Sequence, residues 1–143
     1  MSEQSRLSPL RHNILCVDDD KNILRTLKRL LVQESFGVLT ATSGKEGLAI
    51  LRSNARIDLI VSDQRMPEMS GSDFLAAARE LAPHIPRMMI TGYSDAFSTA
   101  DVLIRAQASC VLAKPWKTEE LLYEVRTALQ SGGSRITEEL VLV

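Results

Sequence analysis

Apolar positions follow two different periods along this chain. Short apolar runs, typical of buried strands, occupy residues 13–17, 37–42, 57–61, 87–90 and 109–113. Between and after these runs, apolar residues recur every three or four positions, which predicts amphipathic helices. Strand and helix therefore alternate five times, a pattern that favours an α/β fold with a doubly wound parallel sheet and helices on both faces.

Local signals support the predicted helix starts. Asp20 can cap the first helix, and Ser43 with Glu46 has the spacing of a capping box for the second. A third helix follows Gly71, and the last begins near Thr118. A weaker helix between them, capped by Ser94 or Asp95, would carry a set of apolar residues: Phe97, Ala100, Leu103 and Ile104.

Five polar residues share one place in this pattern, at or just past the C-terminal end of a predicted strand: Asp18, Asp19, Asp63, Thr91 and Lys114. The C-terminal ends of parallel strands meet at one edge of a sheet, where ligands of such folds bind. Taken alone, Asp63 is equally compatible with a turn-capping aspartate. The shared position of all five residues favours a functional site.

This set of side chains predicts phosphoryl chemistry. Three carboxylates within ~4 Å repel one another by about 4 kcal/mol per pair at an effective dielectric constant of 20, so the site requires a cation. Hard oxygen ligands suit Mg²⁺, which often bridges carboxylates and phosphate oxygens. Thr91 and Lys114 supply donors for phosphoryl oxygens, and Asp63 is the candidate nucleophile for an aspartyl phosphate.

The chain resembles a two-component response regulator receiver domain over residues 11–131. The resemblance rests on four separated motifs in order, which are Val17-Asp18-Asp19-Asp20, Ser62-Asp63 with Met66-Pro67 and Gly71, Ile90-Thr91-Gly92, and Lys114-Pro115. It implies a flavodoxin-like fold with five helices and a five-stranded parallel sheet of strand order 2-1-3-4-5.

The resemblance also implies a role for each site residue. Asp18 and Asp19 would form the acidic Mg²⁺ pocket together with Asp63 and the backbone carbonyl of Arg65. Asp63 would accept a phosphoryl group from a histidine kinase or phosphotransfer protein. Thr91 would move toward that group and Lys114 would pair with it, and the Lys114–Pro115 bond would be cis.

Size and composition restrict the function further. A chain of 143 residues suggests one domain, and a net charge of −1 gives no general attraction to nucleic acid, so direct DNA binding is not expected. The first eleven residues are polar and lack the apolar region typical of a signal peptide, and no apolar run is long enough to span a membrane, so we expect a cytoplasmic protein. Cys16 and Cys110 lie in apolar runs without metal-type spacing, which predicts buried, reduced thiols.

We expect three segments: a flexible leader (residues 1–11), the receiver domain (12–131), and a tail or the start of a linker to an output domain (132–143). In the tail, Ile136, Leu140 and Val143 have helical spacing. The motifs are similar to receivers attached to HD-GYP phosphodiesterases or sensor kinases. We expect a partner protein or output domain to bind the face formed by the last two helices and the fifth strand, where homodimers are also common in the family.

Three other functions are compatible with parts of the pattern. A pseudo-receiver would bind partners without phosphorylation, although the complete set of site residues argues against it. An aspartyl-phosphate phosphatase would need a second acid two residues after the nucleophile, where this chain has Arg65. Flavin binding is disfavoured because an acidic edge repels a flavin phosphate. We therefore expect a signalling domain and not a turnover enzyme.

One departure from the family affects the switch. Many receivers have Tyr or Phe three residues before the lysine, and this chain has Val111. Phosphorylation would then act through backbone shifts between Thr91 and Ala106 or through Trp116. The alternative for Trp116 is a partly buried packing residue.

Arg65 and Tyr93, each two residues past a key site residue, predict slow self-dephosphorylation, because two bulky side chains could screen water from the phosphoryl group. We expect Arg65→Ala and Tyr93→Ala variants to lose phosphate faster than the parent protein, as followed by intact mass over time. Variants that lose phosphate no faster would contradict the screening hypothesis.

Overall fold

The computed structural model describes the backbone of residues 11–92, 104 and 106–142, and the side chains of these residues up to Gln130. The elements of this part of the chain are β1 (Asn13–Val17), α2 (Lys21–Gln33), β2 (Gly37–Ala41), α3 (Gly44–Arg52), β3 (Leu59–Asp63), α4 (Gly71–Leu81), β4 (Arg87–Thr91), β5 (Cys110–Ala113) and α6 (Thr118–Leu142). The five predicted strands are all present, and β3 is shifted by two residues from the predicted range 57–61, so that it begins at Leu59 and ends at Asp63.

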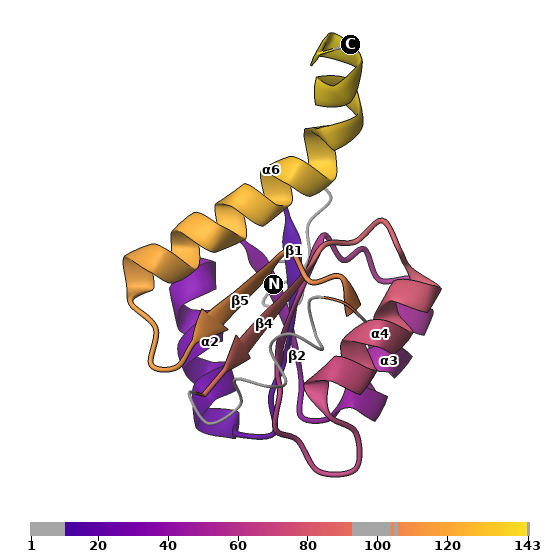
Figure 1. Ribbon diagram of the computed structural model, residues 1–143. Helices are drawn as coiled ribbons and strands as arrows, with labels where there is room; N and C mark the ends of the chain where they lie inside the picture. Colours follow the sequence, from indigo (N-terminus) through magenta and orange to yellow (C-terminus); the bar gives the residue numbers. More distant parts are fainter. Residues whose placement is uncertain (1–10, 93–103, 105, 143) are drawn as a thin grey trace.

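The strands form one parallel sheet in the order β2-β1-β3-β4-β5, which confirms the predicted flavodoxin-like topology. Helices α2 and α6 cover one face, whereas α3 and α4 cover the other (Figure 1). Because all connections return to the same end of the sheet, the residues after each strand lie along a single edge.

Successive strand residues belong to different cores because side chains alternate across a sheet. In β1, Ile14 and Cys16 pack with α2 and α6, while Leu15 and Val17 pack with α3 and α4. Phe74 of α4 is fully buried in the second core. Its ring lies so close to α3 that a Cβ atom on Gly47 would be 2.8 Å from Cε1, so glycine allows the two helices to pack at this distance.

The capping predictions for the first two helices are confirmed, with one detail different. Asp20 accepts a hydrogen bond from the N–H of Asn22 at 2.8 Å, and the Ser43 hydroxyl accepts one from Glu46 at 3.1 Å. The Glu46 carboxylate bonds the N–H of Thr42, one residue before the position that a capping box would use.

Both cysteines are free thiols. Cys16 is buried, as predicted, but Cys110 is only half-buried, because β5 is an edge strand of the sheet. Burial raises the pKa of the Cys16 thiol to about 12, and the nearby Asp18 adds to this effect. Burial likewise raises the pKa of Cys110 to about 12, with a further contribution from Glu124.

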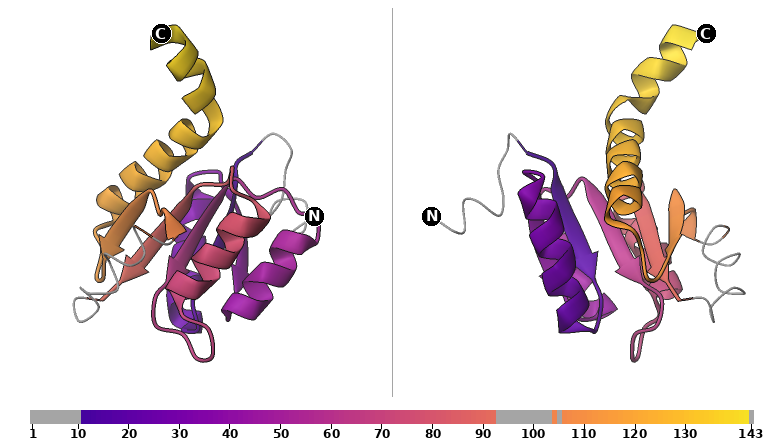
Figure 2. Two further views of the ribbon diagram at one scale, coloured as in Figure 1. Left: turned by 45° about the vertical axis from the view of Figure 1, so that its right-hand side comes forward. Right: turned by 90° about the vertical axis from the view of Figure 1, so that its left-hand side faces the viewer.

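The weaker predicted helix and the C-terminal tail both belong to the second half of the chain, and the structure describes only the second of them. The weaker helix falls mostly on residues 93–103 and 105, which lie outside the described residues. In contrast, α6 continues through Gly132 and Gly133 to Leu142, and its C-terminal part extends beyond the sheet (Figure 2). Glycine is a poor helix former, but these two residues do not end the helix.

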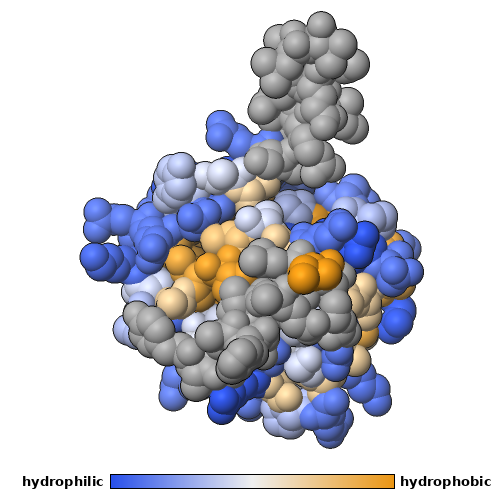
Figure 3. Space-filling view, in the orientation of Figure 1, coloured by the Kyte–Doolittle hydropathy of each residue, from blue (hydrophilic) through white to orange (hydrophobic). Residues whose placement is uncertain are grey.

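The surface is mostly hydrophilic, with an apolar area beside β5 and below α6 in the view of Figure 1 (Figure 3). Two β5 residues, Cys110 and Val111, are half-buried apolar residues in this strand.

None of the helices in the described ranges combines the length and the apolar character that a membrane span requires.

Candidate functional site

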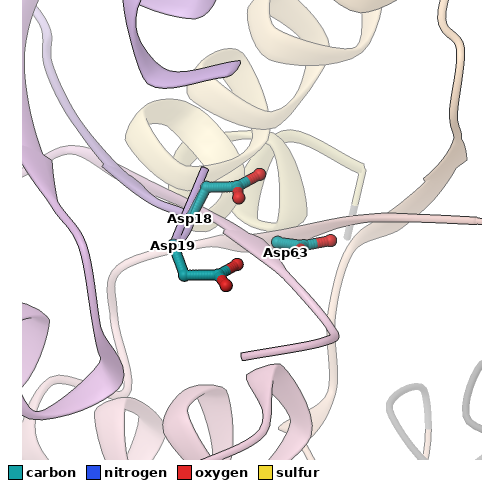
Figure 4. Close-up of side chains that lie close together, drawn as sticks. All are labelled: Asp18, Asp19 and Asp63. Atoms are coloured by element: carbon teal, nitrogen blue, oxygen red, sulfur yellow. The ribbon is translucent and has the colours of Figure 1, made fainter. Parts of the chain in front are cut away.

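Three aspartates converge at the C-terminal edge of the sheet. Asp18 and Asp19 follow β1, and Asp63 ends the neighbouring β3. One carboxylate oxygen from each lies within 4.8 Å of the others, and the three side chains face a common space (Figure 4). Asp18 and Asp63 are buried, with 2% and 8% of their surface exposed, whereas Asp19 is exposed. The structure therefore brings the predicted carboxylates together.

Lys114 lies between two of these carboxylates. Its Nζ atom is 3.0 Å from Oδ1 of Asp63 and 3.3 Å from Oδ2 of Asp18. At an effective dielectric constant of about 20, two carboxylates about 4–5 Å apart repel by roughly 3–4 kcal/mol. One ammonium offsets only part of the repulsion among three carboxylates, so the site keeps an excess of negative charge.

The pKa of Asp18 is raised mainly by burial and to a smaller extent by the neighbouring negative charge. Burial raises its pKa above the ordinary value of 3.8, and the charge of Asp63 raises it further. The N–H of Asp20, which donates to Asp18 at 2.9 Å, and the ammonium of Lys114 act in the opposite direction but do not outweigh these effects.

The pKa of Lys114 responds to the same carboxylates. Burial lowers its pKa, but the hydrogen bond to Asp63 and the charges of Asp18 and Asp63 together raise it above 10.5. The lysine is therefore held in its charged form at neutral pH.

Thr91 and Lys114 lie at the C-terminal ends of the adjacent strands β4 and β5. Thr91 is the last residue of β4 and is 5% exposed. The N–H of Lys114 donates to the Thr91 carbonyl oxygen at 2.8 Å, so the main chain links the two positions directly. The Lys114–Pro115 peptide bond is cis, which confirms the geometry implied by the resemblance.

Gly71 allows the loop after Asp63 to fold back on the strand. A Cβ atom on Gly71 would lie 2.0 Å from the carbonyl oxygen of Asp63, closer than any side chain could approach. The Gly71 N–H also donates to the carbonyl oxygen of Gln64 at 2.8 Å. The sequence motifs include Gly71 but assign no role to Gln64. The polar side chain of Gln64, directly after Asp63, is the feature of the sequence that could have indicated a hydrogen-bonding role.

The remaining predicted residues have different positions. Arg65 is exposed, and Tyr93 lies outside the described residues. Val111 is half-buried and packs on the core beneath α3 and α4. Trp116 is half-buried and packs against the core on the α2 and α6 side, which favours the packing interpretation.

Comparison with known sequences identifies the family. A sequence model of the response regulator receiver domain matches residues 14–126. The chain therefore belongs to the response regulator receiver domain family.

Its relatives include longer regulators. The chain is 35% identical over 127 residues to the hydrogenase transcriptional regulatory protein HoxA of Cupriavidus necator, covering 89% of this chain and 26% of that protein. It is 32% identical over 128 residues to the transcriptional regulatory protein GlrR of Escherichia coli K12, covering 88% of this chain and 28% of that protein. The chain thus spans about a quarter of the length of these relatives.

Solved structures agree with this assignment. The signal receiver domain of an HD domain-containing protein from Pseudomonas fluorescens Pf-5 is similar, with a TM-score of 0.83, 31% identity, and coverage of 87% of this chain and 98% of that chain. A CheY-like receiver domain protein from Methanospirillum hungatei has a TM-score of 0.81, 30% identity and the same two coverages.

The crowded carboxylates predict a stability change in the metal-free protein. In EDTA at pH 7, we expect Asp18→Asn to raise the midpoint temperature of unfolding, because a neutral amide avoids the effects of burial and of Asp63. The raised pKa means that the folded protein binds a proton at Asp18 more tightly than the unfolded chain does. The contribution of Asp18 to parental stability therefore falls as the pH rises from 3.8 through the folded pKa, and the advantage of the variant disappears below 3.8.

Thermal unfolding across pH measures this difference. Asp73→Asn, an exposed change on α4, serves as the control. A lower midpoint for Asp18→Asn in EDTA at pH 7 would contradict the prediction.

Proposed function

We propose that the chain accepts a phosphoryl group on Asp63 from a phosphohistidine of a histidine kinase or phosphotransfer protein, and that this changes its binding to a partner. One observation carries the proposal. Asp63 lies 3.0 Å from the Lys114 ammonium and shares one edge of the sheet with Asp18 and Asp19. Membership of the receiver family supports the same chemistry.

In this proposal, an oxygen of the Asp63 carboxylate attacks phosphorus, the bond from phosphorus to the histidine nitrogen breaks, and that nitrogen leaves with the electron pair. Lys114 is placed to pair with a phosphoryl oxygen once the Asp63 oxygen carries the phosphoryl group as an acyl phosphate. Thr91, at the end of the adjacent strand, supplies a hydroxyl on the same edge. The chain assists only its own phosphorylation and dephosphorylation.

The acidic cluster fits Mg²⁺. Carboxylate oxygens are the hard ligands that this ion prefers, and the three side chains point into one space. Asp18, Asp19, Asp63 and the carbonyl of Arg65 would hold the ion. Its charge would cancel the −2 of three carboxylates and one lysine and would stabilise the negative charge of the transferred group.

The proposal also covers the output of the switch. The relatives HoxA and GlrR are transcriptional regulatory proteins, and this chain matches about a quarter of each. We propose that an output domain or a partner protein responds to phosphorylation through the face that includes β5 and α6, where a homodimer could also form. The apolar area beside β5 supports a contact there (Figure 3). The helix expected next to it lies outside the described residues.

Phosphorylation can be tested with acetyl phosphate as a small donor. We expect intact mass to show a gain of one phosphoryl group that requires Mg²⁺ and is lost in EDTA. Asp63→Asn should abolish the gain because an amide is not a nucleophile at this site.

Asp73→Asn is the matched control, since it makes the same chemical change at an exposed position, and it should be phosphorylated like the parent protein. A folded parent protein that gains no phosphoryl group, or an Asp63→Asn variant that still gains one, would contradict the proposal. The first result would favour a phosphorylation-independent binding module.

A further inference from the structure

Gln64, the residue directly after Asp63, makes three hydrogen bonds to the start of α4. Its backbone carbonyl oxygen accepts from the Gly71 N–H at 2.8 Å. Its side-chain Oε1 accepts from the Ser72 N–H at 2.8 Å and from the Ser72 hydroxyl at 2.9 Å. The residue therefore closes the loop from 64 to 71 with both its main chain and its side chain.

These bonds complete the first turn of α4. The first N–H groups of a helix have no partner within the helix. At this helix, the N–H groups of Gly71 and Ser72 bond to Gln64, and that of Asp73 bonds to the hydroxyl of Ser70 at 3.1 Å. The N–H of Phe74 then makes the first regular helical bond, to the carbonyl oxygen of Ser70. The N–H groups of Gly71, Ser72 and Asp73 thus have three acceptors outside the regular helical hydrogen bonds, and Gln64 supplies two of them.

The start of α4 also lies against the backbone of the phosphoacceptor. The absent Cβ of Gly71 would come within 2.0 Å of the Asp63 carbonyl oxygen and 2.8 Å of the Gln64 Cα. Ser72 is 2% exposed and Gln64 is half-buried, so water has limited access to the bonds between them. Bonds with less competition from water hold geometry more firmly than fully exposed ones do.

We propose that Gln64 is a positioning residue that fixes the main chain of Asp63 and Arg65 against α4 before any ion binds. This inference rests on the proposed function, in which the Asp63 carboxylate and the Arg65 carbonyl bind Mg²⁺. Gln64 lies between these two groups in the chain, and its three bonds limit the movement of both. Groups that orient metal ligands typically change metal affinity by about 10-fold to 100-fold.

The inference is tested by the Mg²⁺ affinity of Gln64→Leu, measured by calorimetric titration of the purified chain. Leucine has no acceptor for Ser72, so we expect the dissociation constant to rise about 10-fold. In the metal-free protein, hydrogen exchange of the Ser72 amide should become faster. Gln64→Glu keeps an acceptor oxygen and should retain at least the parental affinity.

Ser70→Ala is the matched control because it removes the other acceptor of the same helical turn without touching Gln64. We expect it to lower the midpoint temperature of unfolding but to leave the Mg²⁺ affinity unchanged. Ser72→Ala, which removes one donor to Gln64 and keeps the N–H, should weaken Mg²⁺ binding less than Gln64→Leu does. It replaces Gln64→Leu in the test if that variant does not fold.

The outcomes separate this inference from the proposed function. Parental Mg²⁺ binding with unchanged affinity in Gln64→Leu would overturn the positioning role and leave the proposed function standing. An equal loss of affinity in Ser70→Ala and Gln64→Leu would also overturn it, because helix stability alone would then explain the effect. A parent protein that binds no Mg²⁺ would contradict the proposed function itself.

Discussion

Repulsion among three carboxylates at one edge of a parallel sheet is the constraint on which the site depends. Asp18 and Asp63 are buried together, and Lys114 offsets only part of their charge. We therefore expect the metal-free site to be less stable than a neutral one would be. Two cores, one on each face of the sheet, hold the strands of the site in place. In the proposed function, a divalent cation would offset this excess negative charge and would allow an anionic phosphoryl group to approach.

Main-chain contacts connect this site to the surrounding elements. Lys114 and Thr91 are joined by a backbone hydrogen bond, so β5 and β4 are linked where both strands meet the site. On the other side, Gln64 and Gly71 link Asp63 to the start of α4. A change at Asp63 thus has two direct structural routes, toward β4 and β5 and toward α4. Val111 stands where many receivers have an aromatic residue. A conformational change at Asp63 would therefore pass through these hydrogen-bonded links and not through the movement of an aromatic side chain at position 111.

The sequence predicted the strands, the sheet class and the convergence of Asp18, Asp19, Asp63 and Lys114 at one edge, because these depend on local periodicity and on residues at strand ends. Strand order came from the family resemblance, and the structure confirms it. The half-exposure of Cys110 follows from β5 being at the sheet edge. The bonds between Gln64 and Ser72 depend on the path of the loop, which residue types alone do not determine. The continuation of α6 through Gly132 was not predicted, because two glycines favour a helix end.

A crystal structure of the protein with Mg²⁺ and beryllium fluoride would test the central claim most directly, because beryllium fluoride imitates a phosphoryl group on a carboxylate. The account predicts beryllium fluoride on Asp63, with Mg²⁺ bound by Asp18, Asp19, Asp63 and the Arg65 carbonyl. The Lys114 ammonium should contact a fluorine atom. An ion bound elsewhere, or an Asp63 carboxylate that remains unmodified at saturating concentrations of both reagents, would contradict the account.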